Sequence, residues 1–188
     1  MNEGRVAELV RELLVEIGED PDREGLRRTP DRVAKALDFL TAGYRQDVQT
    51  VINNAAFQSQ ANNMIIVRDI EVYSLCEHHM LPFFGRCHIG YIANKQVLGV
   101  SKLARIADVY ARRLQIQERL TEQIAKEVQK AVSPEGVGVV MECRHLCMIM
   151  RGVAKQNSVM TTSSVLGSFH DAPATRAEFM RLIHRGEV

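Results

Sequence analysis

Hydrophobic residues in the first part of the chain predict two helices followed by a polar connector. Apolar positions recur every three to four residues over residues 3–17, which is typical of an amphipathic helix. A second helix is expected over residues 29–42, with Thr29 as its cap and Pro30 at its first helical position. Residues 46–63 are rich in Asn and Gln and are predicted to form a connector with one short helix.

Strand and helix patterns alternate through the rest of the chain. Asn94 and Lys95 separate two strand patterns and indicate a hairpin. Ser101 stands where the next helix begins and is expected to cap it. The predicted elements are strands at 64–75, 86–93 and 96–100, helices at 101–114 and 117–132, strands at 137–150 and 158–169, and a helix at 173–184.

This order of elements predicts an α+β fold in which an antiparallel sheet is covered on one face by helices. An amino-terminal helical segment, residues 1–62, is expected to precede the sheet domain, residues 63–188. A sheet of this kind has open edges, and edges that no other element covers usually pair with other copies of the chain. The pattern therefore predicts a homo-oligomer.

Composition narrows the class of partner and the cellular location. Lys and Arg number 24 against 23 Asp and Glu, so the net charge is only +1, and nucleic-acid binding is not expected. No apolar run is long enough to span a membrane, and the first residues lack the core of a signal peptide. We therefore expect a cytoplasmic protein whose four cysteines are reduced and available to a metal.

The strongest chemical signal lies in residues 71–85, with the sequence EVYSLCEHHMLPFFG. Cys76, His78 and His79 fall within four residues, and thiolate and imidazole are ligands that suit zinc. The spacing of Cys76 and His79 lets one turn direct both side chains at a single ion. A third ligand must come from elsewhere in the chain. Three protein ligands with an open position for water are typical of catalytic zinc, and four of structural zinc.

The strand expected over residues 137–150 offers the missing ligand. By the two-residue period of a strand, Cys143, His145 and Cys147 project to one face. Either Cys147 or Cys143 could complete the site, although lone cysteines are commonly buried as small hydrophobic residues. An unligated histidine near zinc moves protons at neutral pH, and we favour His145 for this role. For His78, proton transfer and a supporting hydrogen bond both stay open.

The first turn of the helix expected at Ser101 carries two cations. The helix dipole disfavours Lys102 and Arg105 there by about 0.3–1 kcal/mol each, and a bound anion would reverse that sign. With Arg151 from the end of the later strand, these side chains predict a phosphate site. The alternative is an ordinary solvated basic face.

Gln117 and Glu118 begin the next predicted helix. A carboxylate beside an amide can accept from two N–H groups and so recognise the edge of a purine. This signal is weak by itself, because Gln and Glu at the start of a helix are common capping and surface residues.

Several long segments of this sequence closely resemble type I GTP cyclohydrolase. They are CEHHMLPFFG, GVSKLARIADVYARRLQIQERLTEQIA, ECRHLCMIMRGV, TPDRVAKAL and DAPATRAEF, and the resemblance runs from about Thr29 to the terminal helix. It implies zinc-dependent hydrolysis of GTP to 7,8-dihydroneopterin triphosphate and formate, the first step of tetrahydrofolate and pterin biosynthesis. It also implies the tunnelling fold and a homodecamer with active sites between subunits, so that residues 63–188 form the catalytic domain.

The resemblance implies a role for each candidate residue. It makes Cys76, His79 and Cys147 the zinc ligands, and thereby selects Cys147 over Cys143. The other implied roles are triphosphate binding by Ser101, Lys102, Arg105 and Arg151, recognition of guanine by Gln117 and Glu118, and proton transfer by His78 and His145. Two alternatives are another tunnelling-fold enzyme acting on a pterin or deazapurine, and a non-catalytic, zinc-stapled nucleotide-binding module with Cys143 as a possible fourth ligand.

Overall fold

The computed structural model of the chain describes residues 1–53, 55–60 and 62–184. Asn54 and Ala61, which belong to the predicted connector, lie outside the described residues. The chain divides into two compact units, Met1–Ala42 and Gly43–Val188. Each unit is described separately below.

The first unit contains two helices that pack together, α1 (Glu3–Glu16) and α2 (Thr29–Leu40). The side chain of Asn2 caps α1 by accepting a hydrogen bond from the backbone N–H of Arg5. The prediction that Thr29 caps α2 is wrong. Thr29 is already part of the helix, and Arg28 occupies the capping position. Pro30 is the second helical residue, not the first as predicted, and it costs no hydrogen bond, since the first N–H groups of a helix have no partner within it.

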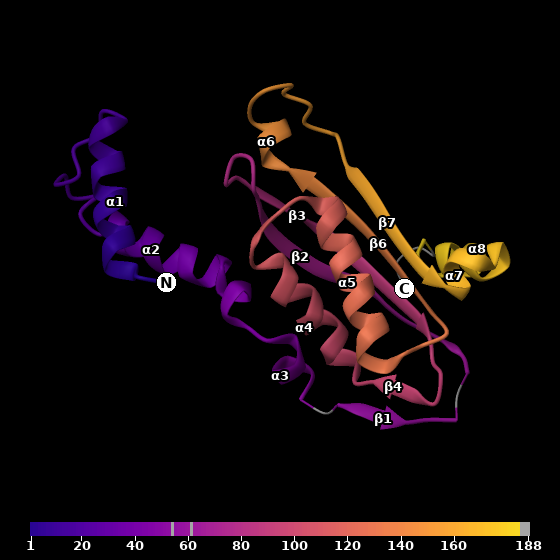
Figure 1. The fold of residues 1–188 in the computed structure, drawn as a ribbon. Coiled ribbons are helices and arrows are strands. Elements are labelled where there is room, and N and C mark those ends of the chain that lie inside the picture. Colours follow the sequence, from indigo (N-terminus) through magenta and orange to yellow (C-terminus); the bar gives the residue numbers. More distant parts are fainter. Residues whose placement is uncertain (54, 61, 185–188) are drawn as a thin grey trace. The chain divides into compact units, whose positions relative to one another are not determined.

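The second unit is built on a five-stranded sheet in the order β5-β2-β3-β6-β7 (Figure 1). The pairs β2–β3, β3–β6 and β6–β7 are antiparallel, and β5 runs parallel to β2 for two residues. The bounds are β2 Met64–Cys76, β3 Pro82–Ile92, β5 Leu114–Gln115, β6 Gly136–His145 and β7 Met160–Gly167. The predicted α+β fold with an antiparallel sheet is therefore confirmed.

The predicted hairpin at Asn94 and Lys95 is wrong. Strand β4 (Gln96–Leu98) does not pair with β3, because β2 and β6 occupy both edges of β3. Instead β4 pairs with β1 (Ala56–Gln58), a strand inside the predicted connector, and forms a separate two-stranded sheet. The remaining elements of the connector region are the 3-10 helix η1 (Ala42–Arg45) and the short helix α3 (Val48–Ile52).

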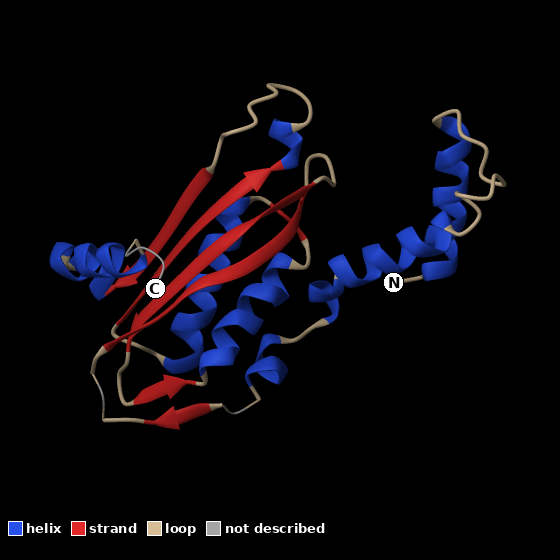
Figure 2. Cartoon of the chain, turned by 180° about the vertical axis from the view of Figure 1, so that it is seen from behind, coloured by secondary structure: helices blue, strands red, loops and turns tan. Residues whose placement is uncertain are grey.

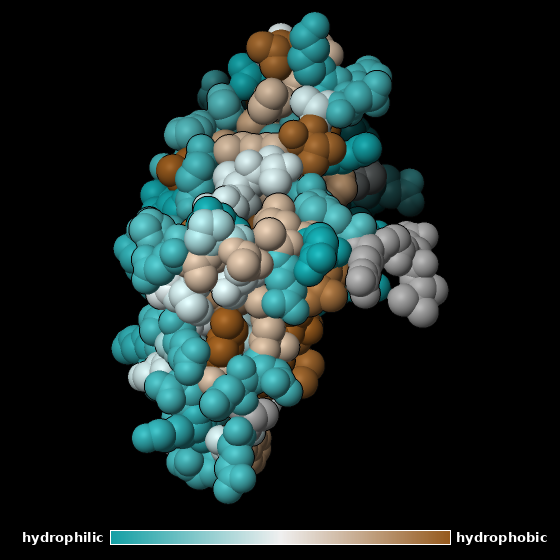
Figure 3. Space-filling view, turned by 90° about the vertical axis from the view of Figure 1, so that its right-hand side faces the viewer, coloured by the Kyte–Doolittle hydropathy of each residue, from teal (hydrophilic) through white to brown (hydrophobic). Residues whose placement is uncertain are grey.

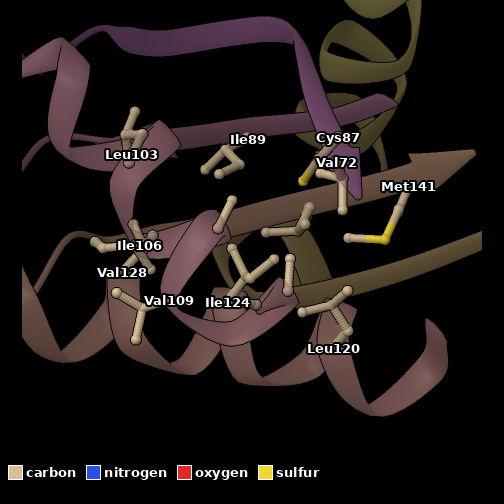
Figure 4. Close-up of a cluster of buried hydrophobic side chains, with 14 of the residues drawn as sticks. Val72, Cys87, Ile89, Leu103, Ile106, Val109, Leu120, Ile124, Val128 and Met141 are labelled. Carbon is tan, nitrogen blue, oxygen red and sulfur yellow. The ribbon is translucent and has the colours of Figure 1, made fainter. Parts of the chain in front are cut away.

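Helices α4 (Val100–Ala111) and α5 (Gln117–Val132) cover one face of the large sheet (Figures 1 and 2). Their apolar sides meet alternate residues of the strands, as expected for period-two burial in a sheet. Figure 4 shows this core, with Ile106 and Ile124 of the helices close to Ile89 and Met141 of the strands. The residue that caps α4 is Gly99, so the prediction that Ser101 caps this helix is wrong.

The opposite face of the sheet is covered at one end by the last helices, α7 (Ser168–Asp171) and α8 (Pro173–Ile183). Phe169 and Phe179 meet edge to face at 5.4 Å between ring centroids and pack with Val140 in a second core cluster. The two rings lie where Gly90 and Gly138 leave room, since an added Cβ at either position would meet a phenyl ring.

One side of the molecular surface is mainly hydrophilic, and its hydrophobic residues form small patches (Figure 3). Across the described residues, no helix combines the length and the apolar character that crossing a membrane requires.

Candidate metal centre and active site

Cys76 ends strand β2, and residues 77–80 form a tight turn before β3. The backbone closes this turn twice: Cys76 N donates to the carbonyl of Leu81 at 2.9 Å, and Met80 N donates to the carbonyl of Cys76 at 2.8 Å. Met80 has a φ of 54°, which is uncommon for a residue other than glycine. The turn leaves His78 and His79 exposed, and we call residues 76–80 the metal turn.

Cys147 reaches the metal turn from the end of strand β6. The predicted strand over 137–150 is too long, because the strand ends at His145 and helix α6 (Leu146–Ile149) follows. Cys147 therefore lies on a helical turn, and the expected strand alternation holds only as far as His145. The ligand atoms of Cys76, His79 and Cys147 all lie within 4.8 Å of one another.

These three side chains fit a zinc ion. Zinc bonds of 2.0–2.3 Å in a tetrahedral site place a thiolate and an imidazole nitrogen about 3.6 Å apart, and Cys76 Sγ lies 3.9 Å from His79 Nδ1. Burial and the neighbouring thiol of Cys76 raise the pKa of Cys147. A cation between the two sulfur atoms would reverse the second effect and favour both thiolates.

Cys143 and His78 stand outside this group of ligands. Cys143 is 1% exposed, and burial raises the pKa of its thiol to about 12, so it stays protonated in the core. His78 is largely exposed, and its Nδ1 lies 3.8 Å from Cys76 Sγ. The fourth position of the candidate metal site thus has no further cysteine among the described residues.

His145 lies at the same end of the sheet as the metal turn, because it pairs with Phe83 in the register of β6 and β3. The two rings stack at 4.6 Å between centroids. Burial lowers the pKa of His145, and the carboxylate of Glu118 partly offsets this shift. A ring that is mainly neutral at neutral pH can both accept and return a proton.

Gln117 fixes which nitrogen of His145 carries the proton. Its side-chain NH2 lies 3.0 Å from the carbonyl of Met141 and 2.9 Å from that of Met160, and both can only accept. Gln117 Oε1 therefore faces His145 Nε2, at 2.8 Å, and Nε2 must be the donor. The other ring nitrogen, Nδ1, is left to exchange protons.

Gln117 and Glu118, the two residues predicted to recognise the base, differ in burial. The Gln117 side chain is fully buried and makes its hydrogen bonds within the chain, whereas Glu118 is exposed. Beside His145 lies a pocket of about 280 Å³ lined by Cys143, His145, Met148, Ser158, Val159 and Met160. Two further residues, Phe83 and Thr162, contact His145 and Gln117, respectively. The sequence carries no signal for either contact, because both depend on which strands pair.

The predicted phosphate-binding residues do not come together in one chain. Ser101, Lys102 and Arg105 lie at the start of α4, where Lys102 Nζ donates to the carbonyl of Val51 at 2.8 Å. The metal turn lies near the other end of α4, because Cys76 pairs with Gln115 of β5, shortly after that helix ends. At a rise of 1.5 Å per residue, the two ends of α4 are about 15 Å apart. Arg151 instead lies at the metal end, where its charge partly offsets the rise that burial and Cys76 cause in the pKa of Cys147.

Comparisons with known proteins match almost the whole chain to one family. The sequence profile of the family described as GTP cyclohydrolase I matches residues 6–184. GTP cyclohydrolase 1 of Leptospira biflexa is 58% identical over 178 residues, which cover 95% of this chain and 97% of the relative. GTP cyclohydrolase 1 of Methylococcus capsulatus is 60% identical over 177 residues, or 94% and 96% of the two chains.

Among solved structures, the apo form of archaeosine synthase QueF-Like matches with a TM-score of 0.46 and 17% sequence identity. The match covers 57% of this chain and 97% of that chain.

Proposed function

The chain belongs to the GTP cyclohydrolase I family, and from this premise we propose that it hydrolyses GTP to 7,8-dihydroneopterin triphosphate and formate with zinc as its metal. The reaction makes it a hydrolase of the pterin and folate pathway. The observation that carries the proposal is the group Cys76, His79 and Cys147 at the same end of the sheet as His145. A cytoplasmic location stays a prediction.

The protein residues around the metal would act on the base. Cys76, His79 and Cys147 would hold the zinc ion, which would supply Lewis-acid activation of water. Attack of water on C8 of the guanine needs a proton at the neighbouring ring nitrogen. His145 would take up a second proton at Nδ1 from solvent and pass it to that nitrogen, because its Nε2 proton is donated to Gln117. His78, exposed in the metal turn, is the second residue for proton transfer.

Recognition of the guanine falls mainly to Glu118. Its exposed carboxylate can accept from two N–H groups of the base, and Glu118 directly follows Gln117, whose side chain contacts His145. Gln117 contributes indirectly, because its buried amide orients the His145 ring.

The triphosphate would be held by Ser101, Lys102 and Arg105 of one copy of the chain and by Arg151 at the metal end of another. The start of α4 and Arg151 lie apart within one chain, which supports a homo-oligomer with sites between subunits. We propose that this oligomer is the homodecamer that the resemblance implies. The triphosphate does not react, so its binding energy serves to position the base.

Turnover of GTP tests the proposed activity. Zinc-loaded protein with GTP is expected to release one formate for each fluorescent pterin formed, and protein stripped of metal is expected to form neither. A nucleotide-binding module would bind GTP but form no formate and no pterin, whether or not zinc is bound. That result would refute the proposed activity.

Mixed oligomers test whether the site lies between subunits. Arg105→Ala and Cys147→Ala chains are each expected to be inactive alone, since one lacks a phosphate contact and the other a metal ligand. After dissociation and reassembly together, about a quarter of the sites would combine both intact halves, so activity should return. A mixture as inactive as its components would place each site within a single chain.

A further inference from the structure

Glu77 lies between metal-turn residues that carry the candidate ligands, and it connects the turn to two other elements. Its backbone N–H donates to the carbonyl of Gln115 in β5 at 3.0 Å. Its carboxylate forms an ion pair with Arg119 in the first turns of α5. Residues 42 positions apart in the sequence are thus joined at the edge of the metal site.

Arg119 uses its guanidinium to contact three acceptors. Nε donates to the side-chain oxygen of Gln115 at 3.0 Å, and one terminal nitrogen contacts both the carbonyl of Leu114, at 3.2 Å, and the Glu77 carboxylate. Only a planar fork of N–H groups can meet these acceptors together, and a lysine ammonium would not reproduce the arrangement.

Gln115, which accepts a hydrogen bond from Arg119, is itself held in place. Gln115 is 2% exposed, and its NH2 donates to the carbonyl of Tyr110 at 3.0 Å and to the side chain of Gln123 at 2.8 Å. Arg119 directly follows Glu118 on α5. The Glu77 pair therefore fixes the metal turn against the segment that carries the base-recognition residue.

We propose that Arg119 is a positioning residue that holds the metal turn in place through Glu77. Its hydrogen bonds go to Gln115, Leu114 and Glu77 rather than to the candidate metal ligands, and its effect passes through the backbone between Cys76 and His79. The link to substrate affinity rests on the proposed function, whereas the link to metal retention rests only on the metal site. Partners that orient metal ligands typically contribute 10–100-fold to metal affinity.

The test compares Arg119→Ala, Arg119→Lys, Glu77→Ala and the double variant Glu77→Ala/Arg119→Ala in the zinc-loaded, full-length protein. The rate of zinc release to a chromophoric chelator is measured first, and KM and kcat for GTP second. Lys126→Ala is the matched control, because it breaks the Lys126–Glu122 ion pair on the exposed side of the same helix.

Zinc release is expected to be about tenfold faster than in the wild type in each single Ala variant. The double variant should release zinc no faster than the single variants, because both changes break the same ion pair. Arg119→Lys should resemble Arg119→Ala, with KM raised more than kcat is lowered, and Lys126→Ala should match the wild type. Release within twofold of the wild type, or effects that multiply in the double variant, would overturn the proposal. Zinc release reports on Arg119 even if no variant, including the wild type, turns over GTP.

Discussion

His145→Ala is expected to lower the rate of pterin formation by about 10²–10⁴-fold while the zinc stays bound, since this is the usual contribution of a positioned proton donor. The side chain is not among the candidate ligands, so its loss leaves Cys76, His79 and Cys147 unchanged. Its ring stacks on Phe83 and its Nε2–H donates a hydrogen bond to Gln117 Oε1, so the protein presents Nδ1 in one orientation.

Turnover and zinc content of the same preparation check this prediction together. His170→Ala is the matched control, because His170 is exposed, pairs with Asp171 and belongs to α7, which follows β7 at the end of β6 opposite His145. It should keep both zinc and activity. Normal turnover of His145→Ala would mean that another group supplies the proton, and loss of zinc would mean that His145 supports the metal site.

Cys147→Ala is expected to remove both the metal and the activity. Two protein ligands, Cys76 and His79, would remain, and these make an incomplete site. We expect the zinc content after dialysis to fall from about one ion per chain to less than about a tenth of that. Metal analysis and the GTP assay measure the two losses independently.

Cys143→Ala is the matched control for this experiment. Cys143 lies in the core, outside the candidate metal site, so its replacement should cost some stability through lost packing but leave the zinc content unchanged. If Cys143→Ala loses zinc instead, the site is a closed one with Cys143 as a ligand, and the structural alternative raised by the sequence would hold.

Local patterns predicted most of the elements that carry the site. The bounds of α5 at Gln117–Val132 agree with the periodicity of its apolar residues, and β2 ends at Cys76, one residue beyond the predicted end. The grouping of Cys76, His79 and Cys147 also follows the resemblance. Ligand type and spacing are local properties, so the sequence alone carries them.

Strand pairing could not be predicted in the same way. The pattern at Asn94 and Lys95 is that of a hairpin, yet β4 pairs with β1, because the edges of β3 are taken by strands far away in the sequence. Cys147 illustrates the same point: alternation continues past His145 in the sequence, but the chain turns into α6 there.

The sequence by itself determined the chemistry of this protein: a Cys-His pair in one turn, a second cysteine to complete a metal site, and basic residues at the start of a helix. Tertiary structure alone decided what each side chain contacts. It buried Gln117 against the carbonyls of β6 and β7, paired Glu77 with Arg119, and placed Lys102 at the far end of α4 from the metal turn. The physical reason is that periodicity records which face of an element is buried, whereas hydrogen-bond partners depend on which elements meet in space.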